Sequence, residues 1–337
     1  MKKILIPERG NSYKANLHCH TNLSDGKLSP EELKRLYKSH GYSVLAYTDH
    51  DIMVPHGNLA DPTFLPLLGY EMEFSENDPS GDTARNKYCH ICLIAPREDA
   101  RQVCFHKSKY LFGAAPLHKN EALFDPSEPD FERSYTPECI NEVVRRARES
   151  GFFVTYNHPT WSCEGYESYS KYRGFSAMEI INYGCKTLGF DEYNARVYDD
   201  MLRLGNRLFC IAADDNHNTN RVDSDSLGAF TVIRADSLTY EDVFSSLKSG
   251  RFYSSEGPKI NALWVEDGIA HIRTSPAARI SFTTGTRHSA SFTRGGTSPL
   301  CYAEFKLERS DTYFRASLED ANGKRAYTNA YFTDEII

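Results

Sequence analysis

The sequence predicts an α/β protein that is built from repeated β/α units and ends in a small all-β unit. From the start of the chain to about residue 257, short apolar runs alternate with segments of helical periodicity, a pattern typical of β/α units. After Gly257-Pro258 the runs alternate in polarity, and Asp-Gly, Thr-Gly, Gly-Gly and Asn-Gly pairs interrupt them, as expected of antiparallel strands joined by tight turns. We therefore predict a first domain over residues 1–257 and an antiparallel β domain over residues 258–337.

The composition is that of a folded protein with a large core. The chain has 337 residues, of which 40% are apolar and 12% are aromatic, and a chain of this size can bury a sizeable interior. The apolar run between Lys3 and Pro7 has only three residues, too few for a signal peptide, and no apolar run approaches the roughly 18 residues of a membrane span. Nine scattered cysteines suit reduced thiols. We expect a cytoplasmic protein that does not cross a membrane.

Seven apolar runs predict the strands of the first domain. The runs are YKANLHCH (13–20), SVLAYTDH (43–50), PLLGYEMEF (66–74), YCHICLIA (88–95), GFFVTYNHP (151–159), AMEIINYG (177–184) and LFCIAADDNH (208–217). The motif Ser29-Pro30-Glu31-Glu32 supplies an N-cap and a proline at the first helical position, so we expect a helix that stops at Gly41. Residues 136–151 and 190–206 also have helical periodicity. Residues 74–88 and 97–135 are predicted to be irregular, which often marks functional loops.

Histidines and acids gather where these strands end. Loops that follow the strands of β/α barrels converge on one face, and residues i and i+2 of a strand point to the same side. His18 and His20 can therefore face one ion, as can Asp215 and His217. Imidazole and carboxylate are ligands for zinc, manganese and iron. The candidate ligands are His18, His20, Asp25, His50, Glu71, His90, His158, Asp215 and His217.

Nine candidate ligands are more than one ion needs. A structural zinc takes four ligands, so the excess predicts two or three divalent ions that share a bridging carboxylate. A lone histidine is more often a core or surface residue, but the paired motifs favour ligands here. Glu73 lies on the same face as Glu71 and is an alternative bridge. The period of two places Asp215 rather than Asp214 beside His217, so we interpret Asp214 as a supporting acid.

The motifs NLHCHTNLSDG, YTDHD, GYE, CHICLIA, YNHP and ADDNH resemble, in order, those of the PHP (polymerase and histidinol phosphatase) superfamily over residues 14–257. The resemblance implies a distorted seven-stranded, TIM-like β/α barrel and a centre of two or three Zn, Mn or Fe ions, held by the nine ligands with Glu71 as the bridge. The runs GRFYSSEGP and LEDANGKRAYTN resemble the subset with a C-terminal β domain, the CehA/McbA-like metallohydrolases. Asp214 stands where this family usually has serine.

The resemblance implies a metal-dependent phosphoesterase, in which a water between two ions attacks phosphorus. We expect the substrate to be a nucleotide, a short oligonucleotide or a small phosphorylated metabolite. Two alternatives remain open: hydrolysis of a carboxylic or carbamic ester if the pocket lacks basic residues, and a non-catalytic barrel. The sequence names no general acid and does not decide the oligomeric state.

Basic residues that could hold a phosphate group lie mainly in one insert. The net charge of the chain is −7, which argues against general nucleic-acid binding, but residues 85–119 carry a net charge of +5. We predict that Lys107 and Lys109 bind phosphate while an aromatic ring of the insert stacks on a base. A solvated face is the alternative interpretation. Further candidates for substrate binding are His118 in the insert, and Lys186 and Arg221, which follow predicted strands.

Overall fold

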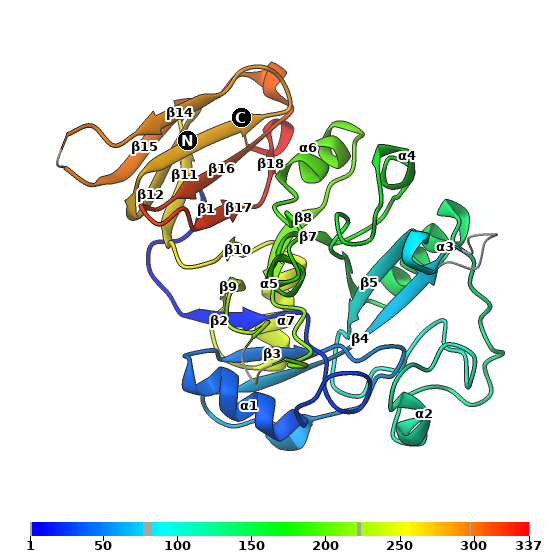
Figure 1. Cartoon of the computed structure of the whole chain (residues 1–337). Coiled ribbons are helices and arrows are strands. Elements are labelled where there is room, and N and C mark those ends of the chain that lie inside the picture. Colours follow the sequence, from blue (N-terminus) through cyan, green and yellow to red (C-terminus); the bar gives the residue numbers. More distant parts are fainter. Residues whose placement is uncertain (1, 77–82, 221–223, 297, 337) are drawn as a thin grey trace.

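The computed structural model describes residues 2–76, 83–220, 224–296 and 298–336. The strands form a long sheet and a separate four-stranded sheet (Figure 1). The order in the long sheet is β14-β13-β16-β17-β10-β9-β2-β3-β4-β5-β6-β7-β8, with β18 paired to β16, and the order in the small sheet is β1-β11-β12-β15. The protein is therefore a mixed α/β structure, as predicted.

All seven predicted strands form, and they are neighbours in chain order. They are β2 (Ser12–Asn16), β3 (Val44–Tyr47), β4 (Leu65–Ser75), β5 (Tyr88–Ile94), β6 (Phe153–Tyr156), β7 (Ala177–Asn182) and β8 (Phe209–Ala213). The β2-β3-β4 and β6-β7-β8 groups are parallel. Strand β5 is antiparallel to both of its neighbours. Its pairing with β4 begins where Ser75 lies opposite Tyr88.

The strands do not close into the barrel that the sequence led us to expect. Strand β2 pairs with β3 on one edge and with β9 (Phe230–Arg234) on the other, so little of β2 is left for β8. Strands β2 and β8 are joined by a parallel bridge past their ends, between Cys19 and Asn216. There the Asp215 N–H donates to the His18 carbonyl at 3.0 Å. The result is an open sheet in which β8, the strand at one end, returns beside β2 at the histidine motifs.

The helices begin where their capping residues predict. Helix α1 (Pro30–Ser39) has Ser29 as its N-cap, with a complete capping box to Glu32. Helix α3 (Pro137–Glu149) is capped by Thr136, and α6 (Ala195–Arg203) lies in the third predicted segment. The remaining helices are α2 (Ala115–His118), α4 (Tyr166–Tyr169), α5 (Tyr183–Thr187), α7 (Tyr240–Lys248) and α8 (Thr333–Ile336). The segment 97–135 is otherwise irregular, as predicted, and part of 74–88 lies outside the described residues.

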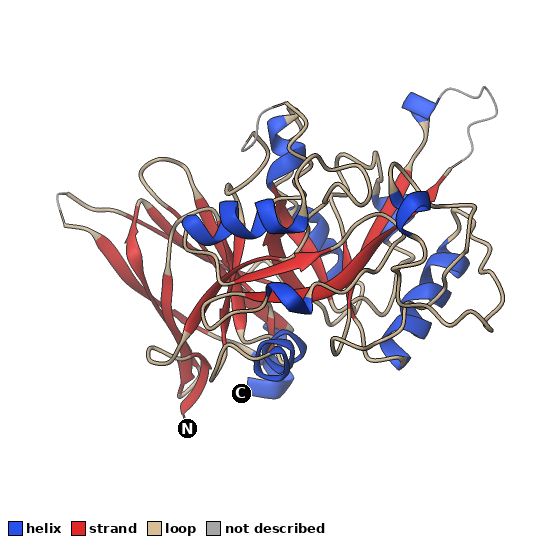
Figure 2. Cartoon of the chain, turned by 90° about the horizontal axis from the view of Figure 1, so that it is seen from below, coloured by secondary structure: helices blue, strands red, loops and turns tan. Residues whose placement is uncertain are grey.

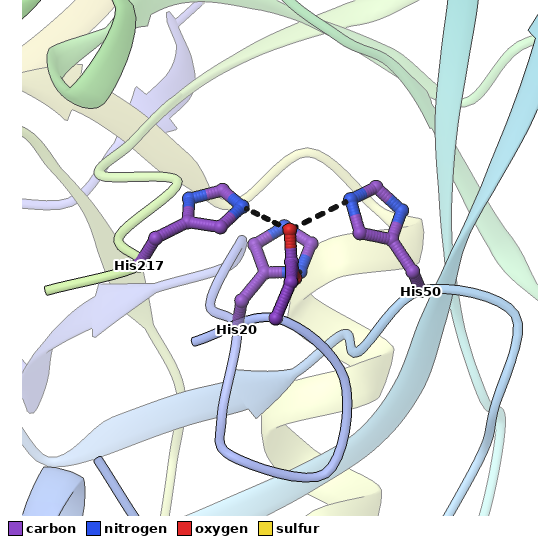
Figure 3. A group of neighbouring side chains, drawn as sticks. His20, His50 and His217 are labelled. Atoms are coloured by element: carbon purple, nitrogen blue, oxygen red, sulfur yellow. Dashed lines mark ion pairs between the residues drawn. The ribbon is translucent and has the colours of Figure 1, made fainter. Parts of the chain in front are cut away.

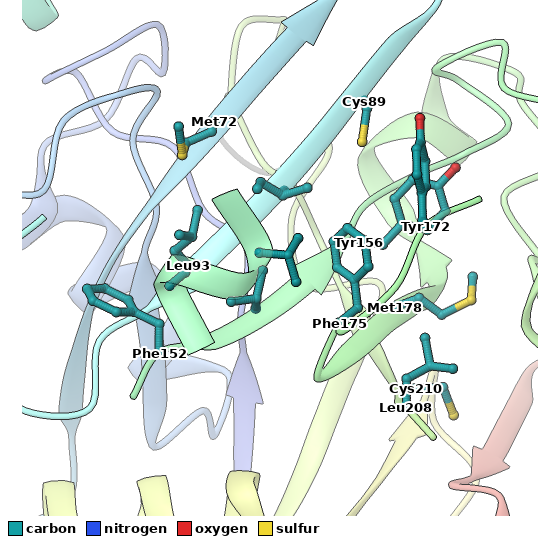
Figure 4. Packing of buried hydrophobic residues seen from close by; sticks show 14 of the residues in the cluster. Met72, Cys89, Leu93, Phe152, Tyr156, Tyr172, Phe175, Met178, Leu208 and Cys210 are labelled. Atoms are coloured by element: carbon teal, nitrogen blue, oxygen red, sulfur yellow. The ribbon is translucent and has the colours of Figure 1, made fainter. Parts of the chain in front are cut away.

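A hydrophobic core lies between the strands β4 to β8 and the helices α3 and α6. Met72, Leu93, Tyr156 and Met178 point into it from four of these strands (Figure 4). The strands β3, β6 and β7 are buried along their whole length, which explains why their sequences read as continuous apolar runs. This packing fixes the strand ends from which the candidate ligands emerge.

The C-terminal strands form a sandwich with strands from both ends of the chain. Strand β1 (Lys2–Ile6) joins β11 (Ile260–Glu266), β12 (Ile269–Ala277) and β15 (Leu300–Lys306) in the small sheet. This sheet packs on β10 (Phe252–Ser255), β13 (Arg279–Thr284), β14 (Ala290–Thr293), β16 (Tyr313–Glu319) and β17 (Arg325–Thr328), with β18 (Tyr331–Phe332) beside them. Figure 2 shows this sandwich at one end of the molecule and the long β4–β5 pair at the other. The boundary near residue 258 stays a prediction.

Buried polar side chains connect the sandwich to the first part of the chain. The Arg315 guanidinium on β16 pairs with Asp199 on α6 at 2.7 and 2.8 Å, and both side chains are buried. Asn329 accepts a hydrogen bond from the Cys210 N–H and donates to the carbonyls of Gly250 and Phe252. No helix among the described residues has the length and apolar character needed to cross a membrane.

The buried pair of Arg315 and Asp199 predicts a large loss of stability when the arginine side chain is replaced. Arg315→Met leaves Asp199 charged and buried, so the free energy of unfolding should fall by about 3–5 kcal/mol. Arg273→Met is the matched control, because the pair of Arg273 with Glu8 is exposed and should contribute at most about 1 kcal/mol. Urea denaturation measures both changes. Equal, small losses for the two variants would contradict a structural role for the buried pair.

Candidate metal centre

The nine candidate ligands lie together at one edge of the curved sheet. They follow β2, β3, β6 and β8 or stand within β4 and β5. Seven of the nine are buried, while Asp25 and His217 have side-chain exposures of 22% and 27%. Figure 3 shows His20, His50 and His217 facing a common centre. The Asp25 Oδ2 atom lies there, 3.2 Å from His217 Nε2 and 3.8 Å from His50 Nε2. The structure therefore brings the whole predicted set together.

The Glu71 carboxylate is the centre of the group. Its Oε1 atom lies 3.1 Å from His18 Nε2, 3.3 Å from His90 Nδ1 and 3.5 Å from His158 Nε2. Its Oε2 atom lies 3.2 Å from His20 Nε2 and 3.5 Å from His50 Nδ1. Each oxygen thus faces a different set of imidazoles, which is the arrangement that a bridging carboxylate requires.

Among the described residues, donor atoms close enough to share an ion form four overlapping groups. Three consist of predicted ligands alone: His18, His20, Glu71 and Asp215; His20, Asp25, His50 and His217; and Glu71, His90 and His158. The fourth joins His18 and His158 to Glu179. Ligands about 2.1 Å from a metal lie roughly 3.0–3.4 Å from one another in octahedral or tetrahedral geometry. Asp215 Oδ1 lies 3.1 Å from both His18 Nε2 and His20 Nε2, in agreement with that spacing.

Unsatisfied buried atoms within the same set support the fit. Asp215 Oδ1, His20 Nδ1 and His90 Nε2 are buried without a hydrogen-bond partner. Buried polar atoms are almost always paired in folded proteins, so three exceptions in one cluster of imidazoles and carboxylates indicate that cations are the missing partners. The donors are nitrogen and oxygen atoms, which suit zinc, manganese and iron.

The electrostatics of the cluster favour a concentrated positive charge. Burial by itself lowers the pKa of His18, but Asp215 and Glu71 outweigh burial and raise that pKa well above its usual value. Burial raises the pKa of Asp215, but His18 and His20 bring it below its usual value. Burial, together with the charge on His20, lowers the pKa of His50 to about 3. Ions that bind here compete with the protons on these imidazoles.

A buried glutamate that the sequence analysis missed orients the cluster. The His18 Nδ1 atom lies 2.8 Å from Glu179 Oε1, and the His158 N–H donates to Glu179 Oε2 at 2.9 Å. A carboxylate behind a ligating histidine fixes the ring and its tautomer. The available signal was an acid in the middle of the apolar run AMEIINYG, because an isolated charge is not buried without a partner.

Two further acids hold the loops that carry the ligands. Asp49 accepts hydrogen bonds from the Thr21 N–H at 2.8 Å and from the Ser24 hydroxyl at 2.6 Å, which fixes the loop before Asp25. Asp225 accepts the His217 N–H at 2.8 Å. Both side chains contact the segments that carry the ligands rather than the centre itself.

Asp214 and Glu73 lie outside the centre. The Asp214 carboxylate accepts three backbone N–H groups from residues 227–229 at 2.7–2.9 Å and the Tyr37 hydroxyl at 2.8 Å. It therefore supports the loop after β8, on the side opposite to Asp215. The Glu73 side chain is 42% exposed, and its Oε2 atom lies 3.3 Å from His90 Nε2. This position is at the edge of the cluster, so the structure favours Glu71 as the shared carboxylate.

The predicted phosphate-binding residues lie away from the cluster. Lys107 donates to the Glu128 carbonyl at 2.8 Å, Lys109 pairs with Glu132, and His118 pairs with Glu121 at 2.8 Å. Lys186 pairs with Glu256. The structure therefore places Lys107 and Lys109 against residues 128–132 and does not bring them to the donor cluster. Arg221 lies outside the described residues.

A cavity of about 340 Å³ opens above the candidate ligands. Besides seven of the nine ligands, its wall includes Glu73, Phe112, Trp161, Thr187, Leu188, Thr219 and Asn220. None of the described residues that line it is lysine or arginine. The cavity therefore combines a floor of metal donors with apolar side chains and few charges.

No protein-family model matches the sequence, and no curated protein matches it. Among solved structures, the chain is similar to a two-domain protein containing a predicted PHP-like metal-dependent phosphoesterase from Bacteroides vulgatus ATCC 8482, with 13% identity over 98% of each chain and a TM-score of 0.43. It is also similar to a candidate metal-dependent phosphoesterase from Bifidobacterium adolescentis ATCC 15703 (15% identity, 62% of this chain and 89% of the other, TM-score 0.35). A third similar structure is an amidohydrolase from Chromobacterium violaceum with bound sulfate and no metal (16% identity, 60% and 87%, TM-score 0.36).

The donor groups predict two or three transition-metal ions per chain after reconstitution. His18→Ala or Asp215→Ala should lower the content by at least one ion, because each removes a donor from the group around Glu71. His118→Ala, a histidine outside the cluster, should keep the full content. Elemental analysis of the purified proteins measures all four. A reconstituted protein with one ion or fewer would contradict a multinuclear centre.

Glu179 should strengthen metal binding without contacting the ions. Glu179→Gln keeps the shape of the side chain but removes the charge behind His18, so metal affinity should fall about 10–100-fold. Competition with a chelator measures the affinity, and circular dichroism checks the fold. Asp311→Asn, which alters a buried acid that pairs with His288 in the sandwich, is the control. An unchanged metal affinity in Glu179→Gln would contradict the role of Glu179 in positioning His18.

Proposed function

We propose that the protein is a metal-dependent hydrolase that cleaves a phosphate ester. The observation that carries the proposal is the position of Glu71, whose two oxygens face five imidazoles from two sides. Divalent ions in such a centre supply an activated water and stabilise the negative charge that grows on the oxygens of the ester. The nine ligands Asp25, His18, His20, His50, Glu71, His90, His158, Asp215 and His217 are the residues that would hold the ions.

Charge favours an anionic substrate. Divalent ions held by the nine ligands would place positive charge at the floor of the cavity, where a phosphate oxygen could approach it without help from a described lysine or arginine. The volume of about 340 Å³ is near the lower end for small-molecule sites, so we infer a small phosphorylated substrate rather than a long nucleic acid.

The protein residues hold and orient the reacting groups. Glu179, Asp49 and Asp225 fix the donors before substrate arrives, which reduces the reorganisation that the reaction requires. His217 and Asp25, the two most exposed of the nine, lie on the cavity side of the centre and are the first donors that an entering ester meets. The buried donors, such as His18, lie behind them.

One observation favours a second function, hydrolysis of a carboxylic or carbamic ester on the same centre. The described wall of the cavity has no lysine or arginine, whereas phosphate sites commonly use guanidinium or ammonium groups. A neutral ester needs no such group. The two functions differ in the bond that is cleaved and can be separated directly.

A substrate screen tests the proposal. Protein reconstituted with Mn, Zn, Fe or Mg should release inorganic phosphate from small phosphate monoesters, and Asp215→Ala should reduce the rate at least about 100-fold. The variant Lys107→Ala/Lys109→Ala should keep its KM within about twofold, because both side chains lie outside the cavity wall. Hydrolysis confined to carboxylic or carbamic esters would replace the proposal with the alternative. Hydrolysis of neither class by a fully metallated protein would refute an enzymatic role.

A further inference from the structure

Three apolar side chains border the mouth of the cavity and have no part in holding metal. Phe112 and Leu188 are 58% and 63% exposed, and Trp161 stands between them and the histidines on the cavity wall. They come from three separate segments, namely the insert, the loop after β6 and the end of α5. Large apolar side chains that are exposed around a concave site commonly mark a ligand-binding surface. We call these three residues the apolar rim.

Two rings of the rim lie directly beside the candidate ligands. The Phe112 ring centroid is 5.7 Å from that of His50. The Trp161 centroid is 5.0 Å from that of His158 and 5.3 Å from that of His90. These contacts are edge-to-face, and both rings line the cavity, so a group of the substrate held near these histidines would lie within reach of aromatic side chains.

The insert is held at the rim by contact with a ligand loop. Gly113 has φ +58°, and a Cβ atom at this position would lie 2.2 Å from the Ser24 carbonyl oxygen. The neighbouring Ala114 N–H donates to the same oxygen at 2.6 Å. Because Ser24 precedes Asp25, this close approach seats Phe112 next to a candidate ligand.

The other two rim residues are fixed in a similar way. A Cβ atom on Gly184 of α5 would lie 2.7 Å from the Asp214 and Asp215 carbonyl oxygens, so α5 packs on the segment that carries Asp215 and presents Leu188 at its end. The Trp161 N–H donates to Glu192, which is fully buried. The rim is therefore a preformed wall, and binding to it costs little side-chain ordering.

We propose that the apolar rim binds a planar aromatic group on the leaving side of the substrate, while the metal centre holds the ester. Flat rings fill the space between two aromatic side chains and a leucine better than a hydrated sugar or amino alcohol does. The cavity volume of about 340 Å³ admits one or two rings together with the ester. The inference rests on the proposed function, since it assigns the leaving group of that hydrolysis. A simple aryl group and a nucleobase share this chemistry.

Kinetics on matched substrates test the apolar rim and distinguish a simple aryl group from a nucleobase as the group that it binds. The holoenzyme and Phe112→Ala are compared on 4-nitrophenyl phosphate, adenosine 5′-monophosphate and glycerol 2-phosphate. Phe112→Ala should raise KM about fivefold to tenfold for an aromatic ester and less than about twofold for glycerol 2-phosphate. An effect on the nitrophenyl ester alone assigns an aryl group, and an effect on the nucleotide assigns a nucleobase. Equal effects on all three substrates would overturn the proposal. Phe292→Ala, on the distant sandwich, is the matched control.

A binding measurement keeps the rim testable if no ester is cleaved. The chain has two tryptophans, so Trp264→Phe leaves Trp161 as the only one. In the metal-loaded Trp264→Phe protein, 4-nitrophenylphosphonate, which has no ester bond to cleave, should quench the fluorescence of Trp161 saturably. Adding Phe112→Ala should weaken that binding about fivefold or more, whereas Leu117→Ala, elsewhere in the insert, should not. Saturable quenching without turnover would refute the hydrolase but keep the rim, and absence of quenching would refute the rim.

Discussion

The Glu71 carboxylate lies where five imidazoles converge, and this crowding is the constraint on which the surrounding structure depends. Imidazoles and carboxylates packed together without water are unstable unless protons or cations balance them. The residues around the centre reflect that demand. Glu179 pairs with a ligand ring, and Asp49 and Asp225 bind the backbone of ligand loops. Each of these buried acids directs its hydrogen bonds to the ligand segments rather than to solvent, so the donors are held in place from behind.

The open edge of the curved sheet contributes to the same arrangement. Strand β9 occupies the edge of β2 that β8 would need to close a barrel, and β2 and β8 are bridged past the ends of the strands, between Cys19 and Asn216. His18, His20 and Asp215 lie at that meeting point. His158 and Asp215 have positive φ values of 25° and 53°, a conformation that is costly for residues other than glycine and that clusters at functional sites. Regular pairing therefore stops where the ligands must turn inward.

Much of this organisation can be predicted from the sequence, for identifiable reasons. Buried strands read as continuous apolar runs, capping residues mark the start of α1, and the spacing of His18 and His20 places both on one side. The reversal of β5 could not be predicted, because an apolar run carries no sign of its direction in a sheet. The competition between β8 and β9 for β2 depends on contacts between distant segments. Glu179 was recognisable as an unusual residue but not as the partner of His18.

The insert shows most clearly how composition can mislead about a site. Its positive charge suggested a phosphate clamp, yet its acids at 128–132 follow about twenty residues after its lysines and pair with them. Arg133 at the end of the insert binds Asp51, the residue after His50, and donates to the Glu73 carbonyl at 3.0 Å. Leu23, Ile52 and Val54 bury Ala115 beside Phe112.

These contacts make the insert a wall that is tied to two ligand loops. Within residues 97–135, the described contribution to the cavity wall is Phe112, so this segment shapes the mouth of the cavity. Positive charge for an anionic substrate must then come mainly from the metal ions. In the proposed hydrolase, the metal centre would bind the ester and the rim would distinguish substrates, which would separate affinity for the reacting group from selectivity for the rest of the molecule.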